Sequence, residues 1–256
     1  MRKKITVALA ATLASLALPA LAETVRIGIA TEPYPPFAVP DARGEYSGWE
    51  IDITKAICTA AKLDCQFVAT AWDGIIPSLQ AEKIDVIAAS LSITEERQKV
   101  IDFSERYYQT GASLAVGQGL DIKPDPASLK GKKIGVQSGS IHQSYALKHF
   151  NGAEIREYQT QDEANQDLFA GRLDATLADA LVLEAFLKSR EGEVCCYDAG
   201  LVAQDDAVLG QGIGFGLRKG NPELKEKLNN AIDSIRASGE YARISSGYFQ
   251  FNIYGE

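Results

Sequence analysis

Apolar runs and helix-like segments alternate along this chain, and that alternation constrains the fold more than any other feature. Between residues 25 and 97 the predicted order is strand, helix, strand, helix, strand, helix, and a second alternation begins near residue 133. Such a pattern predicts an α/β fold of parallel sheets with helices on both faces. Ligands of such sheets bind outside the carboxyl ends of the strands. We therefore expect two similar sheet units whose binding residues lie at strand ends.

The segment 89–97 marks one such strand end. It follows a buried-strand pattern and combines two serines, a helix N-cap signal at Thr94 and the guanidinium of Arg97. A helix N-terminus presents unpaired N–H groups and a positive dipole end, and arginine can hold both oxygens of a carboxylate. The segment is a candidate anion site, and the alternative is an ordinary turn with a solvated arginine. The two serines are Ser90 and Ser92.

Acidic and aromatic residues lie at two further strand ends of the first unit. Three prolines in the segment 31–37 forbid a helix and fix a stiff loop that holds Glu32 and Tyr34 in place. Trp72 follows the next strand, just before a helix for which Asp73 is a natural N-cap. An aromatic residue here either fills the core or stacks on a ligand, and its coincidence with the tyrosine loop favours stacking.

The second unit repeats this arrangement. After a strand over residues 133–136, small hydroxyl residues and a glycine occupy a helix start, which is a second anion-binding geometry. A later strand delivers Asp179 to the same kind of edge, where its carboxylate could accept hydrogen bonds from an ammonium group. Capping of the following helix by Asp179 is an equally good local interpretation. The candidate residues at the helix start are Gln137, Ser138 and Ser140.

The first 22 residues have the pattern of a secretory signal peptide. Three basic residues precede an apolar stretch, and Ala20-Leu21-Ala22 fits the small-residue rule for cleavage before Glu23. We therefore expect a soluble protein outside the cytoplasm. Of 26 basic and 34 acidic residues, three basic ones lie in this segment, so the mature chain carries 23 against 34, a net charge of −11. That charge argues against nucleic acid or anionic membrane as a partner and does not oppose a cationic ligand.

The four cysteines form two pairs in the sequence. Cys58 and Cys65 are close enough to close a small loop at the end of a helix, and neither histidine of the chain is near them. In an oxidising compartment we expect a disulfide there, with a metal site or free thiols as alternatives. Cys195 and Cys196 are adjacent, and a bond between neighbours is strained. Their state stays open, with a vicinal disulfide slightly favoured over two thiols.

Seven phrases follow one another across the mature chain: TVRIGIATEPYPPF, GWEIDITKAIC, WDGIIPSL, IDVIAASLSITEERQKVIDFS, SLKGKKIGVQSGS, AGRLDA and GLRKGNPEL. Together they resemble the periplasmic binding proteins of polar amino acid ABC transporters, solute-binding protein family 3, and in particular the lysine, arginine, ornithine, histidine and opine branch. The resemblance implies a two-lobed type II fold with two hinge strands and a ligand cleft between the lobes. We expect lobe 1 to comprise residues 23–109 and 211–256, and lobe 2 residues 110–210.

The resemblance also implies roles for the candidate residues, and these roles agree with side-chain chemistry. Arginine suits a carboxylate, aspartate suits an ammonium group, and aromatic faces suit an aliphatic or cationic chain. The expected partners are an amino acid ligand and an ABC permease of the inner membrane, and we expect a monomer. The Cys58–Cys65 pair matches a family disulfide in position. The implied contacts are the ligand α-carboxylate with Arg97 and the backbone near Ser92 and Ser140, the α-ammonium with Asp179 and Ser90, and the ligand side chain with Tyr34 and Trp72.

Departures from the family pattern bear on specificity. Ala89 stands where lysine and histidine binders tend to carry a serine, so one hydroxyl is absent. Glu32 has a form more like the opine binders and could meet a distal guanidinium or ammonium. Ile141 and His142 replace the more usual threonine and polar residue after Ser140. The ligand therefore stays open among arginine, ornithine, lysine, histidine and octopine-like opines.

The alternative from a different class is a periplasmic enzyme on the same fold, of the cyclohexadienyl dehydratase type. It would need a general acid or base in the cleft, and Glu32 or His142 could serve. Nothing in the sequence resembles a nucleophile–base pair or a metal cluster, so we expect a binding protein without a cofactor. A receptor sensor domain is disfavoured because no transmembrane or kinase segment follows.

Overall fold

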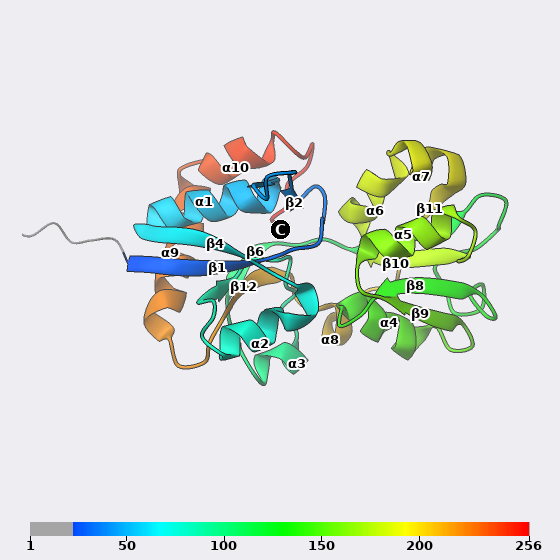
Figure 1. Cartoon of the computed structure of the whole chain (residues 1–256), viewed down its shortest axis with the longest axis horizontal. Helices are drawn as coiled ribbons and strands as arrows, with labels where there is room; N and C mark the ends of the chain where they lie inside the picture. The colour runs from blue at the N-terminus through cyan, green and yellow to red at the C-terminus, as the bar shows by residue number, and fades with distance from the viewer. Residues whose placement is uncertain (1–22, 256) are drawn as a thin grey trace, which may run out of the picture.

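The computed structural model describes residues 23–255, which form two five-stranded sheets and a short two-stranded one. The expected signal peptide lies outside the described residues. Figure 1 shows the two large sheets, each with its own helices, as separate bodies side by side. In this part of the chain, no helix is long and apolar enough to cross a membrane.

The first sheet has the order β4-β1-β5-β12-β6. Its strands are β1 (Glu23–Ala30), β4 (Leu63–Thr70), β5 (Val86–Ile87), β6 (Asp102–Tyr108) and β12 (Ile213–Leu217). Strand β1 pairs parallel with β4 and β5, whereas β12 runs antiparallel to both β5 and β6. The central strands β5 and β12 are buried on both faces because helices cover each side of the sheet.

Three helices pack on one face of the first sheet, and a short helix packs on the other (Figure 1). They are α1 (Trp49–Ala61), α9 (Pro222–Ala237) and α10 (Glu240–Ser245) on one side and α2 (Ile75–Gln80) on the other. The aromatic C-terminal segment, residues 241–254, therefore docks on the first unit. The remaining elements are the hairpin β2 (Val39–Pro40) and β3 (Tyr46–Ser47), the 3₁₀ turn η1 (Trp72–Gly74) and α3 (Glu95–Gln98).

The second sheet has the order β11-β7-β10-β8-β9. Its strands are β7 (Ala112–Gly117), β8 (Lys133–Gln137), β9 (Glu154–Tyr158), β10 (Ala175–Asp179) and β11 (Cys196–Leu201). Strand β8 is parallel to β9 and β10, and β7 is antiparallel to β10 and β11. Its helices are α4 (Ile141–His149), α5 (Gln161–Phe169), α6 (Ala180–Leu187), α7 (Arg190–Cys195) and α8 (Asp206–Leu209).

The α/β architecture is confirmed, but the expectation of purely parallel sheets is wrong. Each sheet contains a strand that enters it directly from the other sheet, namely β7 after β6 and β12 after β11. A parallel neighbour needs a crossover connection within one sheet, usually a helix, and these two strands have none. Both therefore run antiparallel to their neighbours.

The chain passes between the two sheets twice. The first crossing consists of residues 109–111 and the second of residues 202–212. The second is fastened to the first unit, because the Ile93 N–H donates to the Gly212 carbonyl at 2.8 Å and the Gln211 N–H donates to the Ile93 carbonyl at 3.2 Å. The segment 89–97 is thus bonded to a crossing.

Both cysteine pairs are disulfides. Cys58 at the end of α1 is bonded to Cys65 in β4, with 6.1 Å between their Cα atoms, which confirms the expected bond. Cys195 and Cys196 form the slightly favoured vicinal disulfide, at the junction of α7 and β11. The bond between Cys58 and Cys65 links the helix to the edge strand of the first sheet.

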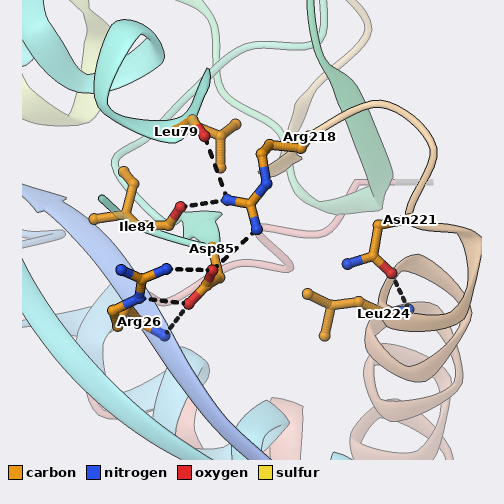
Figure 2. Close-up of polar contacts among 7 residues, drawn as sticks. All are labelled: Arg26, Leu79, Ile84, Asp85, Arg218, Asn221 and Leu224. Atoms are coloured by element: carbon orange, nitrogen blue, oxygen red, sulfur yellow. Dashed lines mark hydrogen bonds and ion pairs between the residues drawn. The ribbon is translucent and has the colours of Figure 1, made fainter. Parts of the chain in front are cut away.

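An ionic cluster around Asp85 joins three strands of the first sheet (Figure 2). The Asp85 carboxylate accepts hydrogen bonds from Arg26 of β1 at 2.8 Å, from both Nε and a terminal nitrogen, and from Arg218 after β12 at 3.0 Å. Arg218 also donates to the carbonyls of Leu79 and Ile84. The hydrogen bonds from Arg26 and, to a smaller extent, the hydrogen bond from Arg218 lower the pKa of Asp85 from 3.8 to about 2.

This lowered pKa predicts an acid-sensitive contribution to stability. A carboxyl group whose pKa is lower in the folded protein stabilises the fold at pH values above its unfolded-state pKa, which is near 4. This stabilisation is lost as the pH falls through the folded-state pKa of about 2. We expect Asp85→Asn to lower the free energy of unfolding at pH 7 by about 1–3 kcal/mol and to flatten its dependence on pH between 4 and 2. Urea unfolding at several pH values measures this.

The matched control is Asp233→Asn, which removes an exposed carboxylate 3.8 Å from Arg236. Such a surface pair is worth at most about 1 kcal/mol. If both variants lost the same free energy of unfolding, the proposed role of the Asp85 cluster would be contradicted.

Candidate functional site

A cavity lies between the two sheet units, and residues from strand ends of both units line it. Every predicted site residue except Ser138 lines this cavity. The predicted residues that it brings together are Glu32, Tyr34, Trp72, Ala89, Ser90, Ser92, Arg97, Gln137, Ser140 and Asp179. Their contacts with a ligand stay a prediction.

Arg97 reaches across the cavity from the first unit. The expected N-cap Thr94 begins α3, because its hydroxyl accepts a hydrogen bond from the Arg97 N–H at 3.3 Å. The guanidinium donates to the Ser92 carbonyl at 3.0 Å and to the Gly139 carbonyl of the second unit at 3.4 Å. Burial lowers the pKa of Arg97 to about 10, so it stays charged at neutral pH. It is therefore a fixed cation that can pair with a carboxylate.

Trp72 lies in η1, and its surroundings correct one prediction. Asp73 does not cap α2: residues 72–74 form a 3₁₀ turn, and the residue at the N-cap position is Gly74. The carboxylate of Glu32 instead accepts the Trp72 N–H at 3.2 Å. The Trp72 ring faces Arg97, whose guanidinium carbon is 5.5 Å from the ring centroid. Glu32 and Trp72 are thus bonded to each other within the first unit.

The turn between β8 and α4 forms the facing wall. Ser140 caps α4, because its hydroxyl accepts the Gln143 N–H at 3.1 Å while donating to the Gln137 carbonyl at 2.6 Å. The Ser138 carbonyl accepts the indole N–H of Trp72 at 3.1 Å. Ser138 does not line the cavity, and its backbone carbonyl makes the contact with the first unit.

Asp179 fulfils the capping interpretation and also lines the cavity. One carboxylate oxygen accepts the Leu181 N–H at 2.8 Å, and the other accepts the Thr110 hydroxyl of the first crossing. Asp179 is only 7% exposed, and this burial raises its pKa to about 6. A cation placed beside it would favour the ionised form.

His142 lines the cavity from the first turn of α4. Burial, together with the charge of Arg97, lowers the pKa of His142 to about 3. The ring is therefore neutral at physiological pH, and it adds a polar but uncharged wall to the cavity beside Arg97.

Glu50 is a cavity residue that the sequence interpretation missed. It lies in the first turn of α1, is 1% exposed, and lines the cavity. Its carboxylate accepts the Ser90 N–H at 2.8 Å, the Ser90 hydroxyl at 3.1 Å and the Tyr107 hydroxyl. These bonds hold Ser90 at a φ of 52°, in the left-handed region that a serine rarely adopts. Burial raises the pKa of Glu50 despite these donors.

Thr110 was also missed, and only its place in the first crossing could have drawn attention to it. For Glu50 the available signal was an acid between two apolar residues, Trp49 and Ile51, at the start of α1. Among residues 23–255 no group of three or more histidine, cysteine or acidic side chains is placed to hold a metal ion.

Comparison with known proteins places this geometry in context. Residues 25–251 match the family model of bacterial extracellular solute-binding proteins, family 3. An L-arginine-binding protein of Pseudomonas aeruginosa is 42% identical over 258 residues, covering 99% of each chain. The lysine/arginine/ornithine-binding periplasmic protein of Escherichia coli is 42% identical over 240 residues, covering 93% of this chain and 92% of the relative.

A solved structure of an ancestral arginine-binding protein bound to arginine has the same fold. It superposes with a TM-score of 0.81 at 35% identity and covers 90% of this chain and 100% of the other. The two-lobed fold expected from the sequence is thereby confirmed.

The bonds of Glu50 predict that its charge supports the turn at Ser90. We expect Glu50→Gln to lower the free energy of unfolding by about 1–3 kcal/mol, because the amide places a donor among groups that donate to the carboxylate. Urea unfolding measures the loss. Glu96→Gln, which alters an exposed acid paired with Lys99, is the matched control and should change stability by less than about 0.5 kcal/mol. A neutral effect of Glu50→Gln would argue against this role.

Proposed function

The chain belongs to the bacterial extracellular solute-binding proteins of family 3, and on that premise we propose that it captures a cationic amino acid between its lobes. Its relatives are periplasmic binding proteins of amino acid transport, and they are named as binding proteins rather than enzymes. The dehydratase alternative is therefore not favoured. The ligand is one of arginine, ornithine, lysine, histidine or an opine.

One observation carries this proposal: a guanidinium and a carboxylate line the same cavity from opposite units. Arg97 comes from the first unit and Asp179 from the second. An α-amino acid carries an anionic carboxylate and a cationic ammonium on one carbon, so it can bridge the two groups only when the units are close together. Ligand contacts to both lobes then favour the closed arrangement over the open one.

The charges of the cavity support a cationic side chain. Three acidic residues, Glu32, Glu50 and Asp179, line the cavity against a single guanidinium, that of Arg97, and His142 is neutral there. A cationic amino acid offsets more of this excess of negative charge than a neutral zwitterion does. In the proposed complex, Arg97 and the backbone near Ser92 and Ser140 hold the α-carboxylate, and Asp179 with Ser90 holds the α-ammonium. Tyr34, Trp72 and Glu32 line the place of the side chain.

The proposed setting rests on the sequence pattern and on the family. Residues 1–22 are a signal peptide cleaved before Glu23, and the mature protein is a periplasmic monomer. Residues 23–109 with 211–256 form one lobe and 110–210 the other, and each moves as a unit about the two crossings. An ABC permease of the inner membrane receives the ligand from the closed form.

Removal of the guanidinium tests the carboxylate site. We expect Arg97→Ala to weaken arginine binding more than tenfold, because each hydrogen bond to a charged group is worth about 1.5–3 kcal/mol. Isothermal titration with arginine, lysine, ornithine and histidine measures the dissociation constants.

Arg43→Ala is the matched control, since Arg43 is an exposed residue of the β2–β3 turn outside the cavity lining. Its affinity should equal that of the parent. Unchanged binding by Arg97→Ala would overturn the site, and a parent that binds only glutamate or glutamine would overturn the cationic ligand.

The pKa of Asp179 predicts weaker binding in acid. An ammonium group needs the ionised carboxylate, so below pH 6 a proton competes with the ligand. We expect the dissociation constant for arginine to rise about tenfold between pH 7.5 and pH 5, a range in which arginine itself does not titrate. Asp179→Asn should bind weakly, with no dependence on pH over that range. A flat profile for the parent would contradict the role of Asp179.

A further inference from the structure

We propose that Trp72 is a positioning residue that holds the two lobes together directly, through a hydrogen bond that includes no ligand atom. Its indole N–H donates to the Ser138 carbonyl at 3.1 Å, from η1 of the first unit to the β8–α4 turn of the second. The proposal deepens the proposed function, because it assigns part of the free energy of closure to the protein itself.

The acceptor side of this bond is a rigid turn. The Ser138 N–H donates to the Tyr158 carbonyl at 2.8 Å, and the Gly139 N–H donates to the Gln143 side chain at 2.7 Å. The next residue, Ser140, caps α4. The Ser138 carbonyl is therefore held in place by its own unit, and an indole that meets it restrains the whole turn.

The donor side is fixed as well. The Glu32 carboxylate accepts the Trp72 backbone N–H at 3.2 Å and thereby anchors η1 to the proline-stiffened loop. Little side-chain freedom remains to be lost when the indole bonds, because two torsions define a tryptophan side chain.

Arg97 contacts the same turn beside Trp72. It donates to the Gly139 carbonyl at 3.4 Å, and its guanidinium carbon lies 5.5 Å from the Trp72 ring centroid. Two adjacent carbonyls of the second unit thus accept hydrogen bonds from two side chains of the first. Arg97 also faces the ligand in the proposed complex, whereas the indole N–H is already used by Ser138.

A bond of this kind predicts a ligand-independent effect. The net worth of a neutral hydrogen bond corresponds to about a three- to tenfold change in an equilibrium constant. Its loss should shift the ligand-free protein toward the open arrangement and should raise the dissociation rate of every ligand by a similar factor. Loss of a stacking contact would instead depend on the ligand.

The test uses Trp72→Phe, which keeps an aromatic ring beside Arg97 but removes the donor. The matched control is Trp49→Phe, because the Trp49 indole N–H donates to the Ser245 hydroxyl at 3.0 Å within the first unit. Both variants lose one indole donor, but only the first loses a bond between the units. Trp49→Phe also leaves Trp72 as the single tryptophan of the chain, which contains two.

Small-angle X-ray scattering of the ligand-free proteins measures the opening, and stopped-flow fluorescence measures dissociation of arginine and lysine. We expect a larger radius of gyration for Trp72→Phe than for the parent and Trp49→Phe. We also expect about a three- to tenfold faster dissociation of both ligands, with a nearly unchanged association rate. In the Trp49→Phe protein, the emission of Trp72 should report a more polar setting at urea concentrations below global unfolding.

An unchanged radius of gyration for ligand-free Trp72→Phe would overturn the proposal, as would a loss restricted to one ligand. If the parent binds neither arginine nor lysine, the proposed ligand class fails, and the scattering comparison still decides the role of Trp72 because it requires no ligand.

Discussion

The buried carboxylate of Glu50 joins the parts of the first lobe on which the site depends. It connects the start of α1 to Ser90 at a strand end and to Tyr107 of β6, which leads into the first crossing. A carboxylate with 1% exposure is costly unless its oxygens are hydrogen-bonded, and these donors satisfy it. The turn that leads to Arg97 and the strand that leaves the lobe are therefore held by the same charge.

The two walls of the cavity are prepared by different means. In the first lobe, hydrogen bonds to protein carbonyls fix the direction of Arg97, so it requires little reorganisation when it meets an anion. In the second, Asp179 is bonded to Thr110 and Leu181, yet burial keeps its pKa near 6. A cation there relieves the cost of the buried charge. In the proposed complex, binding is therefore driven by a preformed donor on one side and a poorly solvated acceptor on the other.

Local chemistry was sufficient to predict much of the site from the sequence. The strand ends, the cap at Thr94 and the edge position of Asp179 follow from periodicity and side-chain type. The antiparallel direction of β12 could not be predicted, because its neighbours lie more than a hundred residues away along the chain. Glu50 escaped notice because the helix pattern around it is the same whether the acid is exposed or buried. The carbonyl of Ser138 carries no signal in its side chain.

The place of β12 also sets the order in which the molecule can be assembled. This strand lies between β5 and β6 in the first sheet, whereas the second sheet uses only strands from residues 112–201. A chain that emerges from its N-terminus can therefore complete the second sheet while β5 still presents an unpaired edge. That edge is a template for unwanted pairing until residues 213–217 arrive. The lobe that begins first is the one that finishes last.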